Sequence, residues 1–226
     1  MTSGLGIAAF TMAMVNAWPY VGLGTEGMTN ATAFAAVKTA LKLGYRHIDT
    51  AANYNNEEGV GAAFRVSGLP RSEVHVTTKY MDGCDFGVPG SAIRSLRQSL
   101  LRLQTDYVDL LMLQVQSRAV WNHGWRPPRG CPDDLSSAAV RANAWRDLVE
   151  AKRLGLTRTI GVANWGLCSL HELSAAGAPS PDAWLGEWHP AFHARPLALY
   201  LRSTGIAHVA FGSLTAMRNK RVRHAV

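Results

Sequence analysis

Three residues between positions 49 and 79 could together form a proton-donating site: Asp49, Tyr54 and Lys79. Asp49 and Lys79 each end a strand-like segment, and neighbouring strands in a sheet lie about 4.8 Å apart, so their side chains could pair. A lysine cation beside a phenol favours the phenolate and lowers the pKa of the tyrosine, while the aspartate would hold the lysine in place. We therefore expect Tyr54 to serve as a general acid near neutral pH.

The same residues also fit a purely structural role. An Asp–Lys pair on adjacent strand ends is a common ion bridge, and Tyr54 could simply anchor a loop. Spacing alone leaves both interpretations open.

These side chains would be positioned by a regular alternation of helix-like and strand-like segments. The first helix is expected to begin at Thr29 or Asn30 and to end at Gly44. The second is expected to open at Asn56, with two glutamates in its first turn, where carboxylates complement the helix dipole. Further helices are predicted at 93–103, 138–154, 167–175 and 196–203, and strands at 45–49, 74–78, 107–113, 158–163, 183–188 and 206–211.

Such alternation builds parallel sheets with right-handed crossovers, and both doubly wound sheets and eight-stranded barrels satisfy it. No G-x-G-x-x-G follows a strand, and the pair Gly22 and Gly24 lacks the third glycine, which disfavours a Rossmann dinucleotide site. Residues 10–25 are expected to form a short hairpin outside the main sheet.

Composition limits the class of protein. A chain of 226 residues with 47% hydrophobic and 17% charged residues can bury a core, which excludes disordered and collagen-like chains. Of the net charge of +7, four positive charges fall in the last nine residues, leaving +3 for the rest. Because no stripe of basic and aromatic residues runs through the chain, we expect no nucleic-acid partner.

The cysteines and the hydropathy of the chain indicate in which cellular compartment the protein is expected. The three cysteines have no C-x-x-C spacing, which fits a reducing cytosol and argues against a disulfide framework or a zinc knuckle. No segment reads as a targeting or membrane-spanning sequence, so a cytoplasmic protein without a membrane partner is expected. His189 and His193 have H-x3-H spacing, but Pro190 between them disfavours a helical metal pair, and we expect no metal.

Eight short motifs together resemble the aldo-keto reductase family, in the family's order and over about residues 16–214. They are VGLGT (21–25), GYRHIDTA (44–51), YNNEEGVG (54–61), TTK (77–79), DYVDLL (106–111), IGVAN (160–164), WHP (188–190) and AFGSL (210–214). The resemblance implies an α/β fold, a (β/α)8 barrel of the TIM type with an N-terminal β-hairpin. It also implies reduction of a small-molecule aldehyde or ketone with NADPH or NADH as cofactor.

The resemblance further assigns a role to each site residue. Tyr54 would be the proton donor, Lys79 the partner that lowers its pKa, and Asp49 the residue that orients Lys79. Asn164 would bind the nicotinamide carboxamide, and Phe211 would stack on the nicotinamide ring. The complete set of cofactor-binding residues implied in this way is Gly24, Thr25, Asp49, Asn164 and Phe211.

Four positions depart from the family pattern. Gln114 stands where the family usually has the fourth catalytic residue, a histidine; a glutamine amide can donate a hydrogen bond to a carbonyl oxygen but cannot relay a proton. Ala163 and Leu185 replace a serine and a glutamine, so two of the three groups that would read the carboxamide are missing. Glu26 stands where many members have a tryptophan in the substrate pocket. We expect weakened or altered turnover.

The length predicts an incomplete barrel within one domain. About six of the eight βα units fit into residues 29–214, ahead of a basic tail at 215–226, and two more units would need about 60 further residues. Open edges of such a sheet favour association, so we expect self-association, dependence on another polypeptide, or a poorly stable fragment. The alternative function is accordingly a catalytically impaired relative that acts as a binding or interaction module.

Overall fold

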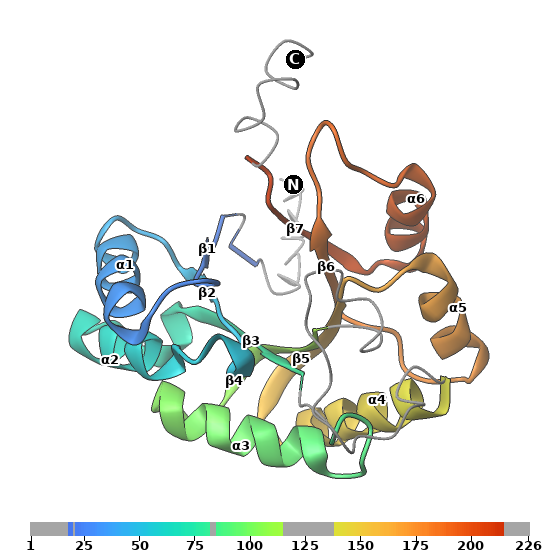
Figure 1. Ribbon diagram of the computed structural model, residues 1–226, viewed down its shortest axis with the longest axis horizontal. Helices are drawn as coiled ribbons and strands as arrows, with labels where there is room; N and C mark the ends of the chain where they lie inside the picture. Colours follow the sequence, from blue (N-terminus) through green and yellow to red (C-terminus); the bar gives the residue numbers. More distant parts are fainter. Residues whose placement is uncertain (1–17, 20, 82–84, 115–137, 215–226) are drawn as a thin grey trace, which may run out of the picture.

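The structure, a computed structural model, describes residues 18–19, 21–81, 85–114 and 138–214. Within these residues one parallel sheet has the strand order β1-β2-β3-β4-β5-β6-β7, so each strand lies beside the next one in the chain. Figure 1 shows this sheet curling into a half-barrel with the helices along its outer side. The strands are β1 (Leu23–Gly24), β2 (His47–Asp49), β3 (His75–Tyr80), β4 (Val108–Leu113), β5 (Thr157–Ala163), β6 (Ala183–Glu187) and β7 (Ala207–Phe211).

Helices connect successive strands, as right-handed crossovers between parallel strands require. In the described part of the chain they are α1 (Asn30–Lys42), α2 (Glu57–Ser67), α3 (Ser91–Leu103), α4 (Ala138–Arg153), α5 (Leu167–Ala175) and α6 (Arg195–Thr204), with short 3-10 helices η1 (Ala52–Tyr54) and η2 (Arg71–Glu73). Helix α1 begins as expected, because Thr29 and Thr32 form a reciprocal capping box. Helices α2 and α6 each end at a left-handed glycine, Gly68 and Gly205.

The predicted parallel alternation is confirmed, and the observed bounds fall within about two residues of the expected ones. The placement of residues 23–24 was wrong. Leu23 and Gly24 do not belong to a hairpin outside the sheet but pair in parallel with Ile48 and Asp49, which makes seven strands in place of the expected six. A two-residue strand shows no alternation that a sequence pattern could reveal. The rest of the predicted hairpin up to residue 17 and the basic tail at 215–226 lie outside the described residues.

Apolar side chains cover both faces of the sheet. The larger cluster joins the strands to the helices and includes the fully buried Trp145 and Trp165. The smaller cluster consists of strand residues alone, and Trp18 packs against it; its members are Leu110, Met112, Ala163, Ala183 and Leu185. Strands buried on both faces explain the near-continuous apolar run in β4. The expected self-association through the edges of the sheet stays a prediction.

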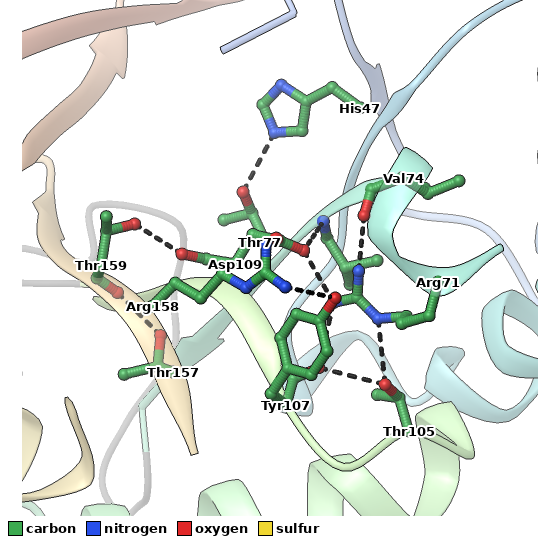
Figure 2. A network of polar contacts seen from close by, with 11 residues as sticks. His47, Arg71, Val74, Thr77, Thr105, Tyr107, Asp109, Thr157, Arg158 and Thr159 are labelled. Atoms are coloured by element: carbon green, nitrogen blue, oxygen red, sulfur yellow. Dashed lines mark hydrogen bonds and ion pairs between the residues drawn. The ribbon is translucent and has the colours of Figure 1, made fainter. Parts of the chain in front are cut away.

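A polar network at the starts of β3, β4 and β5 is centred on Asp109 (Figure 2). One oxygen of Asp109, Oδ2, accepts hydrogen bonds from Arg71 at 2.7 Å and from the backbone amide of Val76 at 2.9 Å. The other, Oδ1, lies 3.6 Å from the guanidinium of Arg158. The guanidinium carbons of Arg71 and Arg158 both lie over the ring of Tyr107, 4.1 and 4.2 Å from its centroid. The network therefore ties the segments that begin these three strands together.

Two histidines lie beside this network, one at the start of β2 and one at the start of β3. The ring of His47 lies 4.7 Å from that of His75, and its Nε2 is 3.0 Å from the hydroxyl of Thr77. Burial lowers the pKa of His75 to about 4, helped by the neighbouring His47 and opposed by Asp109. Burial also lowers the pKa of His47. Both rings are therefore neutral at pH 7.

Protonation of His75 should destabilise the fold in mildly acidic solution. Its folded-state pKa of about 4 lies below the ordinary value of 6.5, so the unfolded chain takes up the proton first as the pH falls. We expect stability to be insensitive to this group above about pH 6.5 and to be lost between pH 6.5 and 4, by at most about 3 kcal/mol. Urea unfolding across this range should show a flatter pH dependence for His75→Phe. The exposed control His171→Phe should keep the wild-type slope, and equal slopes in all three proteins would contradict the assignment.

Candidate active site

The side chains of Asp49, Tyr54 and Lys79 meet at the carboxyl ends of β2 and β3. Asp49 is the last residue of β2, Tyr54 ends η1, and Lys79 is the last but one residue of β3. The Nζ atom of Lys79 forms an ion pair with Asp49 Oδ1 and donates to the hydroxyl of Tyr54 at 3.3 Å. It also donates to the carbonyl oxygen of Thr50 at 3.0 Å. The structure thus brings together Asp49 and Lys79, which were expected to pair because each ends a strand, with Tyr54 from the segment that follows Asp49.

The Lys79 side chain is only 2% exposed, and that of Asp49 is 18% exposed. Removing one partner of a buried ion pair leaves an uncompensated charge, which is strongly destabilising, so Asp49 supplies the charge partner that Lys79 needs in this position. The second carboxylate oxygen, Oδ2, is buried and has no hydrogen-bond partner among the described residues. Asp49 therefore has an acceptor left over for a further donor at this rim.

Asn56 fixes the loop that carries Tyr54. Its Nδ2 donates to the carbonyl oxygens of Thr25 and Met28 at 2.7 and 3.1 Å, and its Oδ1 accepts from the hydroxyl of Thr50 at 2.9 Å. Sequence reasoning had used this residue only as the start of a helix. An asparagine before two glutamates gives no sign of partners that lie about thirty positions away, so these bonds were missed.

The prediction that Lys79 lowers the pKa of Tyr54 is wrong for this structure. Burial of the phenol, together with the negative charges of Asp49 and Glu26, raises its pKa above the ordinary value of 10.0. The physical reason is that the cation of Lys79 is already paired with Asp49, while burial penalises the phenolate. Tyr54 is therefore a protonated phenol at neutral pH. The effect of Glu26, which had been noted only for its place in the sequence, was also missed.

Gln114 follows the last residue of β4 at the same rim. Its backbone amide donates to the carbonyl oxygen of Tyr80 at 3.0 Å, which continues the pairing of β4 with β3 one residue past the strand. The residue is 4% exposed, and its side-chain Oε1 is buried with no hydrogen-bond partner in the described ranges. A buried amide oxygen that lacks a partner usually has a functional reason or an unseen ligand.

The residues expected to hold a nicotinamide lie at this rim: Asn164 directly follows β5, and Phe211 is the last residue of β7. Asn164 has a left-handed backbone with φ of 61°, is exposed, and donates through Nδ2 to the carbonyl oxygen of Gln114 at 3.2 Å. Phe211 is 38% exposed, which leaves its ring available for stacking. Ala163 and Leu185, which replace two polar residues of the family pattern, are both buried and apolar.

The two remaining residues predicted to bind cofactor differ in how accessible they are. A Cβ atom placed on Gly24 would meet no described atom within 4 Å, so the described residues leave space beside this glycine. Thr25 is fully buried, and its hydroxyl donates to the carbonyl oxygen of Asp49 at 3.1 Å. The side chain of Thr25 thus supports the β2 rim, and its contact with a cofactor stays a prediction.

The described part of the chain contains neither a metal-binding cluster nor a membrane-spanning helix. No group of three or more His, Cys, Asp or Glu side chains there could hold a metal ion. None of the described helices has the length and apolar character to cross a membrane. His189, considered above as a metal ligand, instead lies 3.2 Å from the carboxylate of Glu187.

Comparison with known proteins gives consistent matches. The family model described as "Aldo/keto reductase family" matches residues 11–223. An aldo-keto reductase of Mycolicibacterium vanbaalenii is 36% identical over 214 residues, which are 95% of this chain and 70% of the relative. The methylglyoxal reductase DkgB of Salmonella typhimurium is 35% identical over 198 residues, with coverages of 87% and 67%. A crystal structure of a Bombyx mori aldo-keto reductase in complex with NADP is 30% identical, with a TM-score of 0.75 and coverages of 86% and 62%. The chain thus spans about two thirds of the length of these proteins.

The ionisation of Tyr54 provides a test of the electrostatics of this site. We expect no phenolate from Tyr54 below about pH 10 in the wild type, measured as the ultraviolet difference titration against Tyr54→Phe. Asp49→Asn should lower the pKa of Tyr54, because it removes a negative charge that opposes the phenolate and frees the cation of Lys79. Glu26→Gln should act in the same direction but more weakly. A phenolate that forms near neutral pH in the wild type would contradict this account.

Proposed function

This chain belongs to the aldo/keto reductase family, and we propose that it reduces an aldehyde or a ketone to the alcohol, with NADPH as hydride donor and Tyr54 as proton donor. The observation that carries the proposal is the contact of one buried ammonium, that of Lys79, with both the carboxylate of Asp49 and the hydroxyl of Tyr54. The relatives named as reductases and the NADP complex of the Bombyx mori protein support the class of reaction and the cofactor.

In this proposal Tyr54 is an acid that stays protonated until the substrate oxygen becomes strongly basic. When bound, the reduced nicotinamide supplies the hydride that forms the new carbon–hydrogen bond. As the carbonyl carbon receives it, the oxygen becomes an alkoxide, a much stronger base than a phenolate, so Tyr54 can give up its proton even with a raised pKa. The proton moves to the substrate oxygen, and the negative charge moves to the phenol oxygen.

Lys79 stabilises the phenolate that this transfer leaves behind. Its Nζ is 3.3 Å from the Tyr54 oxygen, close enough for a charge-assisted hydrogen bond once the phenol is ionised. Asp49 and the carbonyl oxygen of Thr50 hold the ammonium in place before the reaction. The cation therefore acts mainly on the product of proton transfer, and such preorganised charge is an effective source of catalysis.

Gln114 would polarise the carbonyl by donating a hydrogen bond from its side-chain amide. It cannot titrate, so the pH dependence of turnover in this chain should not depend on this position. The side chain is buried at the rim, and its unpartnered Oε1 is an acceptor that would take a hydrogen bond from a donor on the substrate or cofactor.

The residues at the ends of β5 and β7 fit a nicotinamide ring. Asn164 is exposed and would bind the carboxamide, and the accessible ring of Phe211 would stack on the nicotinamide. Asp49 and the space beside Gly24 complete the group proposed to contact the cofactor. Because Ala163 and Leu185 offer no polar side chain there, we expect weaker binding of the carboxamide than a full set of hydrogen bonds would give.

The same departures favour a second candidate, a module that binds without turnover. A glutamine at position 114 and two apolar side chains at the carboxamide would reduce both polarisation and cofactor binding. The two candidates differ in whether the chain binds a nicotinamide cofactor and in whether Tyr54 contributes to a rate.

Replacing the proton donor should remove most of the activity. Tyr54→Phe keeps the ring but not the acid, and a lost general acid costs on the order of 10² to 10⁴ in kcat. Steady-state oxidation of NADPH with methylglyoxal and a panel of aromatic aldehydes measures this effect. Tyr45→Phe, on the exposed surface ahead of β2, is the matched control and should leave the rate unchanged. Equal activity of Tyr54→Phe and wild type would refute the assignment.

Binding of the cofactor can be measured without turnover. We expect saturable quenching of tryptophan fluorescence by NADPH, weakened by Phe211→Ala by about 10-fold because the stacking contact is lost. Phe192→Ala removes a phenylalanine that is 59% exposed in the turn after β6 and should not change the affinity. Absence of saturable binding in the wild type would favour a module that takes no nicotinamide cofactor.

A further inference from the structure

Helix α2, which directly follows the Tyr54 loop, is held very close to both of its neighbours. A Cβ on Gly59 would collide with the backbone of Asn30 in α1, and a Cβ on Gly61 would come within 2.6 Å of the carbonyl oxygen of Leu103 in α3. Figure 1 shows α1, α2 and α3 side by side along the sheet. The two glycines therefore allow backbone contacts that fix where α2 begins.

The first residue of α2, Glu57, is 1% exposed and uses both of its carboxylate oxygens. Oε1 accepts a hydrogen bond from the hydroxyl of Thr78 at 2.6 Å. Oε2 accepts from Nε of Arg102 at 2.8 Å, and Nη2 of the same arginine lies 2.7 Å away. Arg102 is in the last turn of α3, and its side chain is 33% exposed. The carboxylate thus joins three elements: α2, β3 and α3.

This connection adjoins the proton-donating site at two points. Glu57 lies three positions after Tyr54, and Thr78 directly precedes Lys79. The bond between Glu57 and Thr78 therefore links the segment that carries the phenol to the strand that carries the ammonium. Arg102 holds this link from α3.

We propose that the Glu57–Arg102 ion pair is a positioning device that sets the separation between the hydroxyl of Tyr54 and the ammonium of Lys79. The inference rests on the proposed role of Tyr54 as proton donor. In no described contact does Arg102 touch Tyr54 or Lys79, so it acts through Glu57. Without Arg102 the buried carboxylate has no cation, and it must either move toward water or take up a proton. Either change disturbs its bond to Thr78.

A displacement of this kind should appear in the rate and not in substrate binding. A misplacement of about 1 Å at a reacting group can cost on the order of 10²-fold in rate. For Arg102→Met we expect kcat to fall by about 10- to 100-fold, with the KM for the carbonyl substrate changed less than about 2-fold. Arg102→Lys keeps a cation beside Glu57 and should restore most of kcat.

Loss of stability alone has to be separated from loss of positioning. Arg71→Met is the matched control, because it also breaks a largely buried arginine–carboxylate pair, with Asp109, at the opposite end of β3 from Lys79. It should lower the thermal unfolding temperature at least as much as Arg102→Met while leaving kcat within about 2-fold of the wild type.

A second readout does not need turnover. The ring-carbon NMR resonance of Tyr54 in protein made with isotope-labelled tyrosine can be assigned by its absence in Tyr54→Phe. It should shift in Arg102→Met and keep its wild-type position in Arg71→Met and Arg102→Lys.

The two readouts separate failure of this inference from failure of the proposed function. An active wild type with full kcat in Arg102→Met overturns the positioning role while the reductase assignment stands. If the wild type turns over no carbonyl, the proposed function fails and the resonance of Tyr54 decides the positioning role. A shift specific to Arg102→Met then supports the role, and an unmoved resonance, or equal shifts in the Arg71 and Arg102 variants, refutes it.

Discussion

The ammonium of Lys79 is a full charge with 2% of its side chain exposed, at the end of a strand that is otherwise packed on both faces. Such a charge is stable only with a partner, and Asp49 on the neighbouring strand supplies it. The parallel pairing of β2 with β3 places the two strand ends at one edge. The 3-10 helix η1 then brings the hydroxyl of Tyr54 within 3.3 Å of the same ammonium. The positions of Asp49 and Tyr54 thus follow from the need to surround this one buried ammonium with acceptors.

Polar groups at the two ends of β3 have different roles. At the start of β3, the backbone amide of Val76 donates to Asp109, which pairs with Arg71 and holds the starts of three strands together. At the other end of β3, Lys79 and Thr78 face the residues proposed for chemistry and for its positioning. In the network around Asp109, the carboxylate has partners from three segments: Arg71, the backbone amide of Val76, and Arg158. The rim at the carboxyl ends of the strands keeps three buried acceptors without partners among the described residues: Asp49 Oδ2, Asn53 Oδ1 and Gln114 Oε1.

Pairing and burial together explain why the phenol does not behave as an isolated Tyr–Lys contact would. Asp49 neutralises Lys79 and also adds its own negative charge near Tyr54. The resulting protonated phenol suits an acid that must deliver a proton to an alkoxide, because premature ionisation would leave it nothing to donate. The pKa of Tyr54 therefore depends on the burial of the phenol and on the charges around it, and both are set only when the strand ends are assembled.

The amino-acid pattern by itself determined the alternating helices and strands, because hydrophobic periodicity, caps and turn residues are local. It also placed Asp49 and Lys79 together, since the carboxyl ends of neighbouring parallel strands share an edge. Only the tertiary structure decided that Leu23–Gly24 belongs to the sheet, that Asn56 and Glu57 support the site, and that the pKa of Tyr54 rises. The strand pairing and the bonds of Asn56 and Glu57 involve partners twenty or more positions away, and the pKa of Tyr54 depends mainly on its burial. A pattern of neighbouring residues carries no information about either.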